Sequence, residues 1–484
     1  MGSSRIAVAA LSMLMTWPAP VAAQRAVTLD GVARAMGGKE RILGVRTLVL
    51  EGNGRVLNFG QNRTPYAEDF FEVTSFRRTI DYPNRRWLLD QTRVPRFPTA
   101  NTNPQRQRLG VDAAVAYNIG TNNAMARVGG AAATDRAREL LYQPIGFIQA
   151  AYAPGTEVSV EPVSDNIQRI RINPGGDKFA MHVDRATMLP TRIEKIVHHA
   201  MLGDVTLATE LSNWRDLDGL KVPGQMVQRM AERWVLADYT ITATHVNPAA
   251  IDNIAATDSV RRTTPLTPQR PNVVVEELAP GVWSLAGQSH HTIAIEQQRR
   301  VVLVEVPQSE ARSLAAIASA RALRPAKPVD LVINTHHHFD HSGGVRAAIS
   351  EGLTIMTHAE NRDFYERHVF PGQHFIMPDA QYRNPRPLRL IAVSDAHVIT
   401  DSLRSIEVYS IDGSAHSGSM LVVYLPAERL LIQADLYNPP AANAANPVFP
   451  FLANLLENIQ RRGLQVDRVV GIHGRPVLFS DLAK

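Results

Sequence analysis

The chain has 484 residues, of which 45% are hydrophobic and 20% charged, so it can bury sizeable cores but is too long for one ordinary domain. Two domains of roughly 200–250 residues are the natural division. The net charge of +5 is spread thinly and no nucleic-acid motif accompanies it, so we expect no nucleic-acid partner. The lack of cysteine excludes disulfides and thiolate metal ligands.

Residues 1–23 have the pattern of a secretory signal peptide. Arg5 precedes an apolar stretch from Ile6 to Trp17, and the small residues Val21-Ala22-Ala23 form a cleavage site before Gln24. The apolar stretch is too short to cross a bilayer comfortably, so we do not expect a transmembrane protein. We predict a soluble protein that is exported, periplasmic or secreted, after cleavage of this segment.

Residues 24–262 are predicted to form a mostly antiparallel β domain. A short helix over Leu29 to Gly38 is followed by short alternating runs, of which Ile167 to Ile172 is the clearest strand. One helical interlude covers Asp135 to Tyr152. Three prolines between residues 263 and 272 mark a linker, which sets the boundary to a second compact unit.

This first domain is loosely similar to the half-barrel domains of periplasmic lipoprotein carriers. The similarity lies in the start Ala35-Met36-Gly37-Gly38 and in the late strands Leu189 to Ile193 and Leu220 to Pro223. It implies a curved sheet that holds an apolar cavity closed by helices. A sheet that only scaffolds the second domain fits the same pattern.

Residues 273–484 begin with short strands, and a helix over Ser309 to Ala322 leads into the apolar strand Val329 to Asn334. A later hairpin pairs Met420 to Leu425 with Leu430 to Ala434. Mixed strands followed by helices predict two sheets between helical layers.

Four histidines and an aspartate lie directly behind the apolar strand, in His336-His337-His338-Phe339-Asp340-His341. Open α/β sheets bind their ligands at the C-terminal ends of strands, so this loop is a candidate active site. In extended backbone His336 and His338 point the same way, while Asp340 and His341 fall on the following turn. Imidazole and carboxylate are ligands of divalent metals, and this spacing suits two ions.

At these positions the chain resembles the metallo-β-lactamase superfamily, whose His-x-His-x-Asp-His signature matches His336, His338, Asp340 and His341. The resemblance implies an α+β chain in which an αββα sandwich over residues 273–484 follows the mostly antiparallel β domain. Three later residues fit the family's remaining site positions, and these are His416, Asp435 and His473.

The resemblance further implies two divalent metal ions, with Asp435 bridging them. Zinc is the expected metal, and an all-nitrogen-and-oxygen site would also accept iron or manganese. Ala434 replaces the glycine that usually precedes the bridging aspartate, which is the one departure from the family pattern. The first ion would be held by His336, His338 and His416, and the second by Asp340, His341 and His473.

Two adjacent ions hold hydroxide as a nucleophile, so we expect hydrolysis of an ester, lactone, amide or related bond in a small, partly hydrophobic molecule. Asp340 would also position the hydroxide, which makes it the expected catalytic residue. Three alternatives stay open: a β-lactamase of the cysteine-free type, a mono-iron oxidoreductase like the persulfide dioxygenases, and a hydrophobe carrier with a vestigial site. His290 and His291, in a loop between early strands, are further candidates for a role near the substrate.

Overall fold

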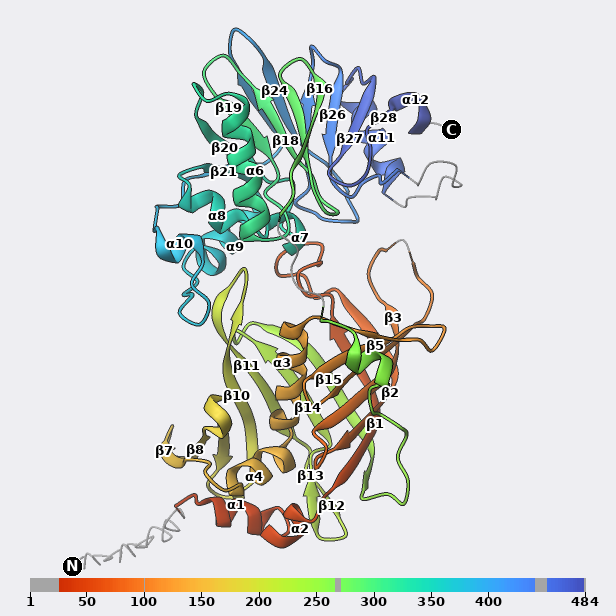
Figure 1. The fold of residues 1–484 in the computed structure, drawn as a ribbon, viewed down its shortest axis with the longest axis vertical. Helices are drawn as coiled ribbons and strands as arrows, with labels where there is room; N and C mark the ends of the chain where they lie inside the picture. The colour runs from red at the N-terminus through yellow and green to blue at the C-terminus, as the bar shows by residue number, and fades with distance from the viewer. Residues whose placement is uncertain (1–25, 100, 266–270, 440–450, 483–484) are drawn as a thin grey trace, which may run out of the picture.

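The computed structural model describes residues 26–99, 101–265, 271–439 and 451–482. The predicted signal peptide lies outside this range, as do residues 266–270 of the predicted linker. Within the described ranges, the helices are all too short or too polar to span a membrane. Figure 1 shows an N-terminal domain, coloured red to green, and a C-terminal domain, coloured green to blue, stacked along the long axis.

The N-terminal domain is built on one antiparallel sheet. In the described part of the chain it has 13 strands in the order β6-β5-β4-β3-β2-β1-β15-β14-β11-β10-β9-β8-β7, beside a small β12-β13 hairpin. This confirms the predicted mostly antiparallel β domain. The strands are β1 (Thr47–Leu57), β2 (Phe70–Asp81), β3 (Arg86–Pro95), β4 (Gln105–Asp112), β5 (Val115–Ile119), β6 (Met125–Arg127), β7 (Val158–Pro162), β8 (Ile167–Ile172), β9 (Phe179–Asp184), β10 (Pro190–His199), β11 (Gly203–Ser212), β12 (Arg215–Leu217), β13 (Leu220–Val222), β14 (Gln225–Met230) and β15 (Trp234–Val246).

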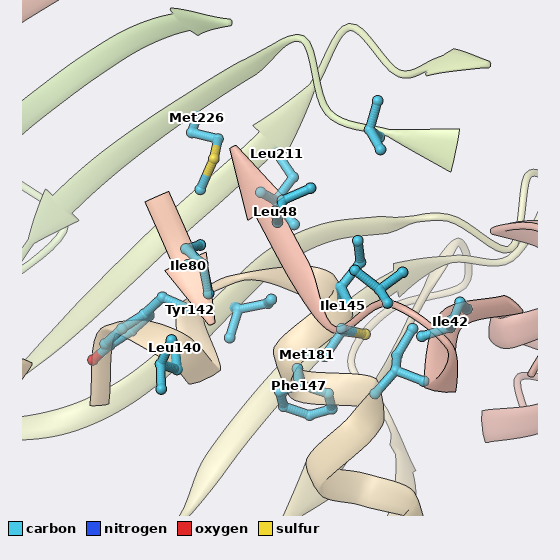
Figure 2. Close-up of a cluster of buried hydrophobic side chains, with 14 of the residues drawn as sticks. Ile42, Leu48, Ile80, Leu140, Tyr142, Ile145, Phe147, Met181, Leu211 and Met226 are labelled. Carbon is cyan, nitrogen blue, oxygen red and sulfur yellow. The ribbon is translucent and has the colours of Figure 1, made fainter. Parts of the chain in front are cut away.

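Helices fill the concave face of this sheet. Figure 2 shows Phe147 and Ile145 of α4 (Pro144–Tyr152) gathered with strand residues in one buried cluster. The space left beside Met226 and Tyr239 measures about 20 Å³, room for about one water molecule. In this region the implied cavity is filled by the protein's own side chains. The other helices of the domain are α1 (Leu29–Ala35), α2 (Lys39–Leu43), α3 (Gly130–Arg138) and α5 (Asp258–Arg262).

The C-terminal domain consists of two sheets packed face to face. Among the described residues, β16 to β22 form a seven-stranded sheet and β23 to β28 a six-stranded sheet, each in sequence order. Buried aliphatic side chains of both sheets form one cluster between them. The strands are β16 (Val274–Ala279), β17 (Val282–Ala286), β18 (Thr292–Glu296), β19 (Val301–Val304), β20 (Val329–Ile333), β21 (Thr354–His358), β22 (Leu390–Val393), β23 (Ala396–Thr400), β24 (Ser405–Ser410), β25 (Leu421–Leu425), β26 (Leu430–Gln433), β27 (Arg468–Gly471) and β28 (Val477–Leu478).

Helices cover the outer faces of both sheets. α6 (Glu310–Leu323) and α8 (Val345–Ser350) pack on the first sheet, and α11 (Leu452–Arg461) packs on the second. Ser309 caps α6 by accepting a hydrogen bond from the Arg312 amide at 3.4 Å. Helix, sheet, sheet and helix follow one another through the domain, which confirms the predicted αββα sandwich.

The two domains share a hydrophobic cluster. Trp234 of β15 is only 5% exposed, and its ring centroid lies 6.3 Å from Phe364 and 5.0 Å from His368 of the C-terminal domain. Met201 and Met230 belong to the same cluster. This shared core gives a physical reason for the two units to unfold together. The boundary at residues 263–272 stays a prediction.

Candidate metal centre

The histidine-rich motif begins where β20 ends, between two parallel neighbours, β19 and β21. The chain then turns into the short helix α7 (Phe339–Ser342). The Ser342 hydroxyl closes this turn by donating to the carbonyls of His337 and His338 at 2.9 and 2.8 Å. Only glycine fits at Gly344, because a Cβ there would lie 1.8 Å from Ser313 Oγ. The motif is therefore held on a tight turn against α6.

The structure brings all seven predicted site residues together in two adjacent groups of possible metal ligands. The ligand atoms within each group lie within 4.8 Å of one another. Metal binding by these side chains stays a prediction. The first group consists of His336, His338, His416 and Asp435, and the second of His290, Asp340, His341 and His473.

Asp435 lies between the two groups. Its Oδ2 is 3.1 Å from His416 Nε2 and 2.8 Å from His341 Nε2, and its Oδ1 is 2.9 Å from His473 Nε2. Burial acts to raise the pKa of Asp435, but the charge of His341 and the histidine hydrogen bonds hold it well below its usual range. Its backbone has φ of +60°, a costly conformation for a non-glycine residue. Asp435 is thus an ionised carboxylate held under backbone strain where both groups can reach it.

The first group fits a divalent ion. Nδ1 of His338 is buried and finds no hydrogen-bond partner within the described ranges. Nε2 of His336 and Nε2 of His416 are also buried, and both face Asp435 Oδ2, at 3.5 and 3.1 Å. Burial lowers the pKa of His336 to about 4 and that of His338 well below its ordinary value. Neutral imidazole is the form that binds metals, and a buried nitrogen without a partner is costly unless something else satisfies it.

The second group combines a carboxylate with imidazoles, one of which is oriented by a hydrogen bond on the side of the ring that faces away from the group. Burial acts to raise the pKa of Asp340, but the hydrogen bond from His290 and the charge of His341 hold it well below its usual range. Nδ1 of His473 donates to the Ser289 carbonyl at 2.9 Å, so the lone pair of its Nε2 faces the group. An ionised carboxylate and oriented imidazoles suit a second divalent ion.

His290 lies closer to the centre than the sequence pattern predicts. Its Nε2 is 3.3 Å from Asp340 Oδ2, and its ring centroid is 4.0 Å from that of His473. We expected it near the substrate, whereas the structure places it within ligand distance of the second group. Nothing in the local sequence distinguishes His290 from His291 beside it.

Glu305 is a buried carboxylate that the sequence analysis missed. It accepts a hydrogen bond from the Thr335 amide at 2.7 Å, and its other oxygen lies 3.5 Å from His341 Nδ1. Burial acts to lower the pKa of His341, but the carboxylates of Asp435 and Glu305 outweigh it and hold this pKa well above its ordinary value. The two carboxylates therefore favour a positive charge at the position of His341. Glu305 comes directly after the apolar strand β19, which neighbours β20. This position is the sequence signal that would have identified Glu305.

An open cleft of about 390 Å³ leads to both groups from between the domains. Its walls include Phe97 of the N-terminal domain and Phe451 of the C-terminal domain. Arg63 also lines it, and its charge is matched by the buried Asp69, whose Oδ1 accepts from Arg63 Nε at 2.9 Å. Such a cleft suits a small molecule with an apolar part.

The family model of the metallo-beta-lactamase superfamily matches residues 287–441. This range runs from the loop before β18 to a few residues past Asp435, so it includes the motif and His416 but not His473. The match identifies a metallo-β-lactamase superfamily domain at residues 287–441, within the αββα sandwich.

Solved structures similar to this chain include a metallo-beta-lactamase from Pontibacter korlensis, at 18% identity over 44% of this chain and 96% of that chain, with a TM-score of 0.33. Another is a stereoselective inverting sec-alkylsulfatase from Pseudomonas sp., at 18% identity over 44% of this chain and 40% of that chain, with a TM-score of 0.33.

A curated relative is the 2,4-dinitroanisole O-demethylase subunit alpha of Nocardioides sp. (strain JS1661). It is 25% identical over 174 residues, which are 36% of this chain and 49% of the relative. The chain thus spans about half the length of the curated relative it matches.

Proposed function

We propose that the chain is a metal-dependent hydrolase that uses two divalent ions, zinc being the expected metal, on an ester, lactone, amide or related bond of a small molecule. The observation that carries this function is the pair of adjacent ligand groups with Asp435 between them. One ion would be held by His336, His338 and His416, and the other by Asp340, His341 and His473.

Ions bound there would lower the pKa of a coordinated water toward neutrality and polarise the bond to be cleaved. Asp340 is ionised and held at both oxygens, by Gln61 Nε2 at 2.7 Å and by His290 Nε2 at 3.3 Å. Its remaining lone pairs can accept a hydrogen bond from the attacking water and fix its orientation. Phe97 and Phe451 would contact an apolar part of the substrate.

Purified protein is expected to carry about two metal ions per chain and to lose hydrolytic activity to a chelator, with recovery on adding zinc. Elemental analysis gives the metal content. Activity is measured on lactones, carboxylic esters, β-lactams and phosphodiesters. The panel also includes 2,4-dinitroanisole, because the curated relative is named for its O-demethylation.

Other outcomes would favour the alternatives. Turnover of β-lactams above all other substrates would favour the cysteine-free β-lactamase. One iron per chain with oxidation of a persulfide would favour the mono-iron oxidoreductase. Protein that binds no metal and hydrolyses nothing in the panel would contradict the proposed hydrolase.

We also propose that the chain is exported, which rests on the signal-like pattern of residues 1–23. Protein recovered from the periplasm or the medium is expected to begin at Gln24 when its N-terminus is sequenced. An Ala23→Tyr variant should stay uncleaved, because tyrosine does not fit a small-residue site. Full-length wild type found only in the cytoplasm would contradict export.

A further inference from the structure

The loop between β1 and β2 reaches from the N-terminal domain to the candidate metal centre. Figure 1 shows this loop against α7, across the boundary between the two domains. Four consecutive residues of the loop, Gly60, Gln61, Asn62 and Arg63, each make a hydrogen bond to the C-terminal domain. We call residues 60–63 the clasp segment.

The clasp segment contacts the first motif at three successive residues. The Gly60 carbonyl accepts from the Phe339 amide at 3.1 Å. Gln61 Nε2 donates to Asp340 Oδ1 at 2.7 Å. His338 Nε2 donates to the Asn62 carbonyl at 2.9 Å, in a fully buried position.

The last residue of the clasp segment holds the loop that carries His416. The Arg63 carbonyl accepts from the Gly418 amide at 2.7 Å and from the Ser417 hydroxyl at 3.3 Å. One short stretch of the N-terminal domain therefore touches two of the three chain segments that supply the first ligand group, those that carry His338 and His416.

These contacts set the tautomer of one site residue, His338, and the orientation of another, Asp340. The hydrogen bond to Asn62 puts the proton of neutral His338 on Nε2, so Nδ1 carries the lone pair. That Nδ1 is the nitrogen for which the described residues offer no partner. The Gln61 amide fixes one oxygen of Asp340 and thereby the direction of its carboxylate.

The clasp segment is also held by hydrogen bonds within its own domain. The buried carboxylate of Asp69 accepts from the Arg63 amide at 2.6 Å, and Asn62 Nδ2 donates to the Ala67 carbonyl at 2.7 Å. Gly60 has φ of +77°, and a Cβ there would lie 2.3 Å from the Phe339 ring. Only glycine allows the backbone to approach the motif this closely.

We propose that the clasp segment positions the metal ligands, a role that rests on the proposed function. Gln61 orients Asp340, and the Asn62 carbonyl sets the tautomer of His338. Because the segment belongs to the N-terminal domain, metal binding and the contact between the domains are coupled. Linkage makes this coupling reciprocal: the docked clasp segment increases the affinity for the ion, and a bound ion stabilises the docking of the clasp segment by the same free energy.

The test compares two full-length variants. Gln61→Ala removes the amide that contacts Asp340. Gln225→Ala is the matched control, because Gln225 Nε2 donates to Asp238 Oδ1 at 2.9 Å in the same domain but away from the centre. Zinc affinity is measured by competition with a chromogenic chelator, starting from metal-free protein. Thermal unfolding of the metal-free proteins shows whether each variant keeps its fold.

Gln61→Ala is expected to weaken zinc binding at the second of the two proposed sites, the one that contains Asp340, by about 10–100-fold. This is the usual cost of losing a hydrogen-bond partner that orients a metal ligand. Gln225→Ala should bind zinc as the wild type does. Equal zinc affinities in Gln61→Ala and wild type would overturn the positioning role while leaving the hydrolase intact. A wild type that binds no zinc would overturn both.

Hydrogen exchange supplies a readout independent of affinity. Zinc is expected to slow amide exchange in peptides that cover residues 58–69 of the wild type, and to slow it less in Gln61→Ala. Exchange over residues 58–69 that zinc leaves unchanged in the wild type would overturn the coupling between metal and domain contact.

Discussion

Asp435→Ala is expected to weaken both metal sites at once and to abolish most hydrolytic activity. The carboxylate of Asp435 is 3.1 Å from His416 Nε2 in one group and 2.8 Å from His341 Nε2 in the other. Its loss removes a negative charge that both groups share and leaves the first group with imidazoles alone in a buried centre. The loss of activity should exceed the roughly 100-fold that removing an outer partner costs.

Metal content per chain and the rate on the best substrate check this expectation. His473→Ala is the comparison within the site, and it should mainly empty the second group. Asp467→Ala is the matched control outside it, because Asp467 is an exposed aspartate paired with Arg429 at 3.0 Å. If Asp435→Ala retains two ions and the wild-type rate, Asp435 does not bridge. A fully metallated wild type that holds only one ion, with Asp435→Ala unchanged in metal content and rate, would make a single-metal mechanism the better account.

Trp234→Ala is expected to lower the free energy of unfolding by about 3–5 kcal/mol, the usual cost of truncating a buried aromatic side chain. Trp234 lies in the cluster that both domains share, and its Nε1 donates to the Pro65 carbonyl at 3.2 Å. Pro65 follows the clasp segment by two residues. The substitution should therefore also loosen the clasp segment and weaken zinc binding.

Trp214→Ala is the matched control. Trp214 is half-buried in the same domain, and its Nε1 also donates to a proline carbonyl, that of Pro190, at 3.2 Å. Chemical denaturation should show a smaller loss of stability for Trp214→Ala, without any effect on zinc affinity. A Trp234→Ala protein that is as stable as Trp214→Ala and binds zinc normally would contradict a role for the shared cluster in docking the domains.

The sequence by itself determined the elements and the chemistry that depend on local pattern. The apolar run Val329 to Asn334 predicts the strand that the structure shows as β20, and Ile167 to Ile172 matches β8 residue for residue. Period-two geometry was enough to expect His336 and His338 on one side of the loop. The αββα order also followed from the sequence, because strand and helix signals depend on neighbours a few residues away.

Packing between distant segments was decided only by the tertiary structure. No local pattern shows that α4 fills the curved N-terminal sheet, so the carrier-like resemblance could not tell a cavity from a core. Glu305 reaches His341 only because β19 pairs in parallel with β20.

The clasp segment depends on tertiary structure most of all. Gln61 and Asp340 are 279 residues apart in the chain, and their contact exists because two separate sheets dock through the cluster around Trp234. Hydrophobic periodicity identifies which face of an element is buried, but it does not identify the partner against which that face is buried. The ligands of the proposed metal centre are therefore visible in the sequence, whereas the N-terminal contacts that orient them are visible only in the fold.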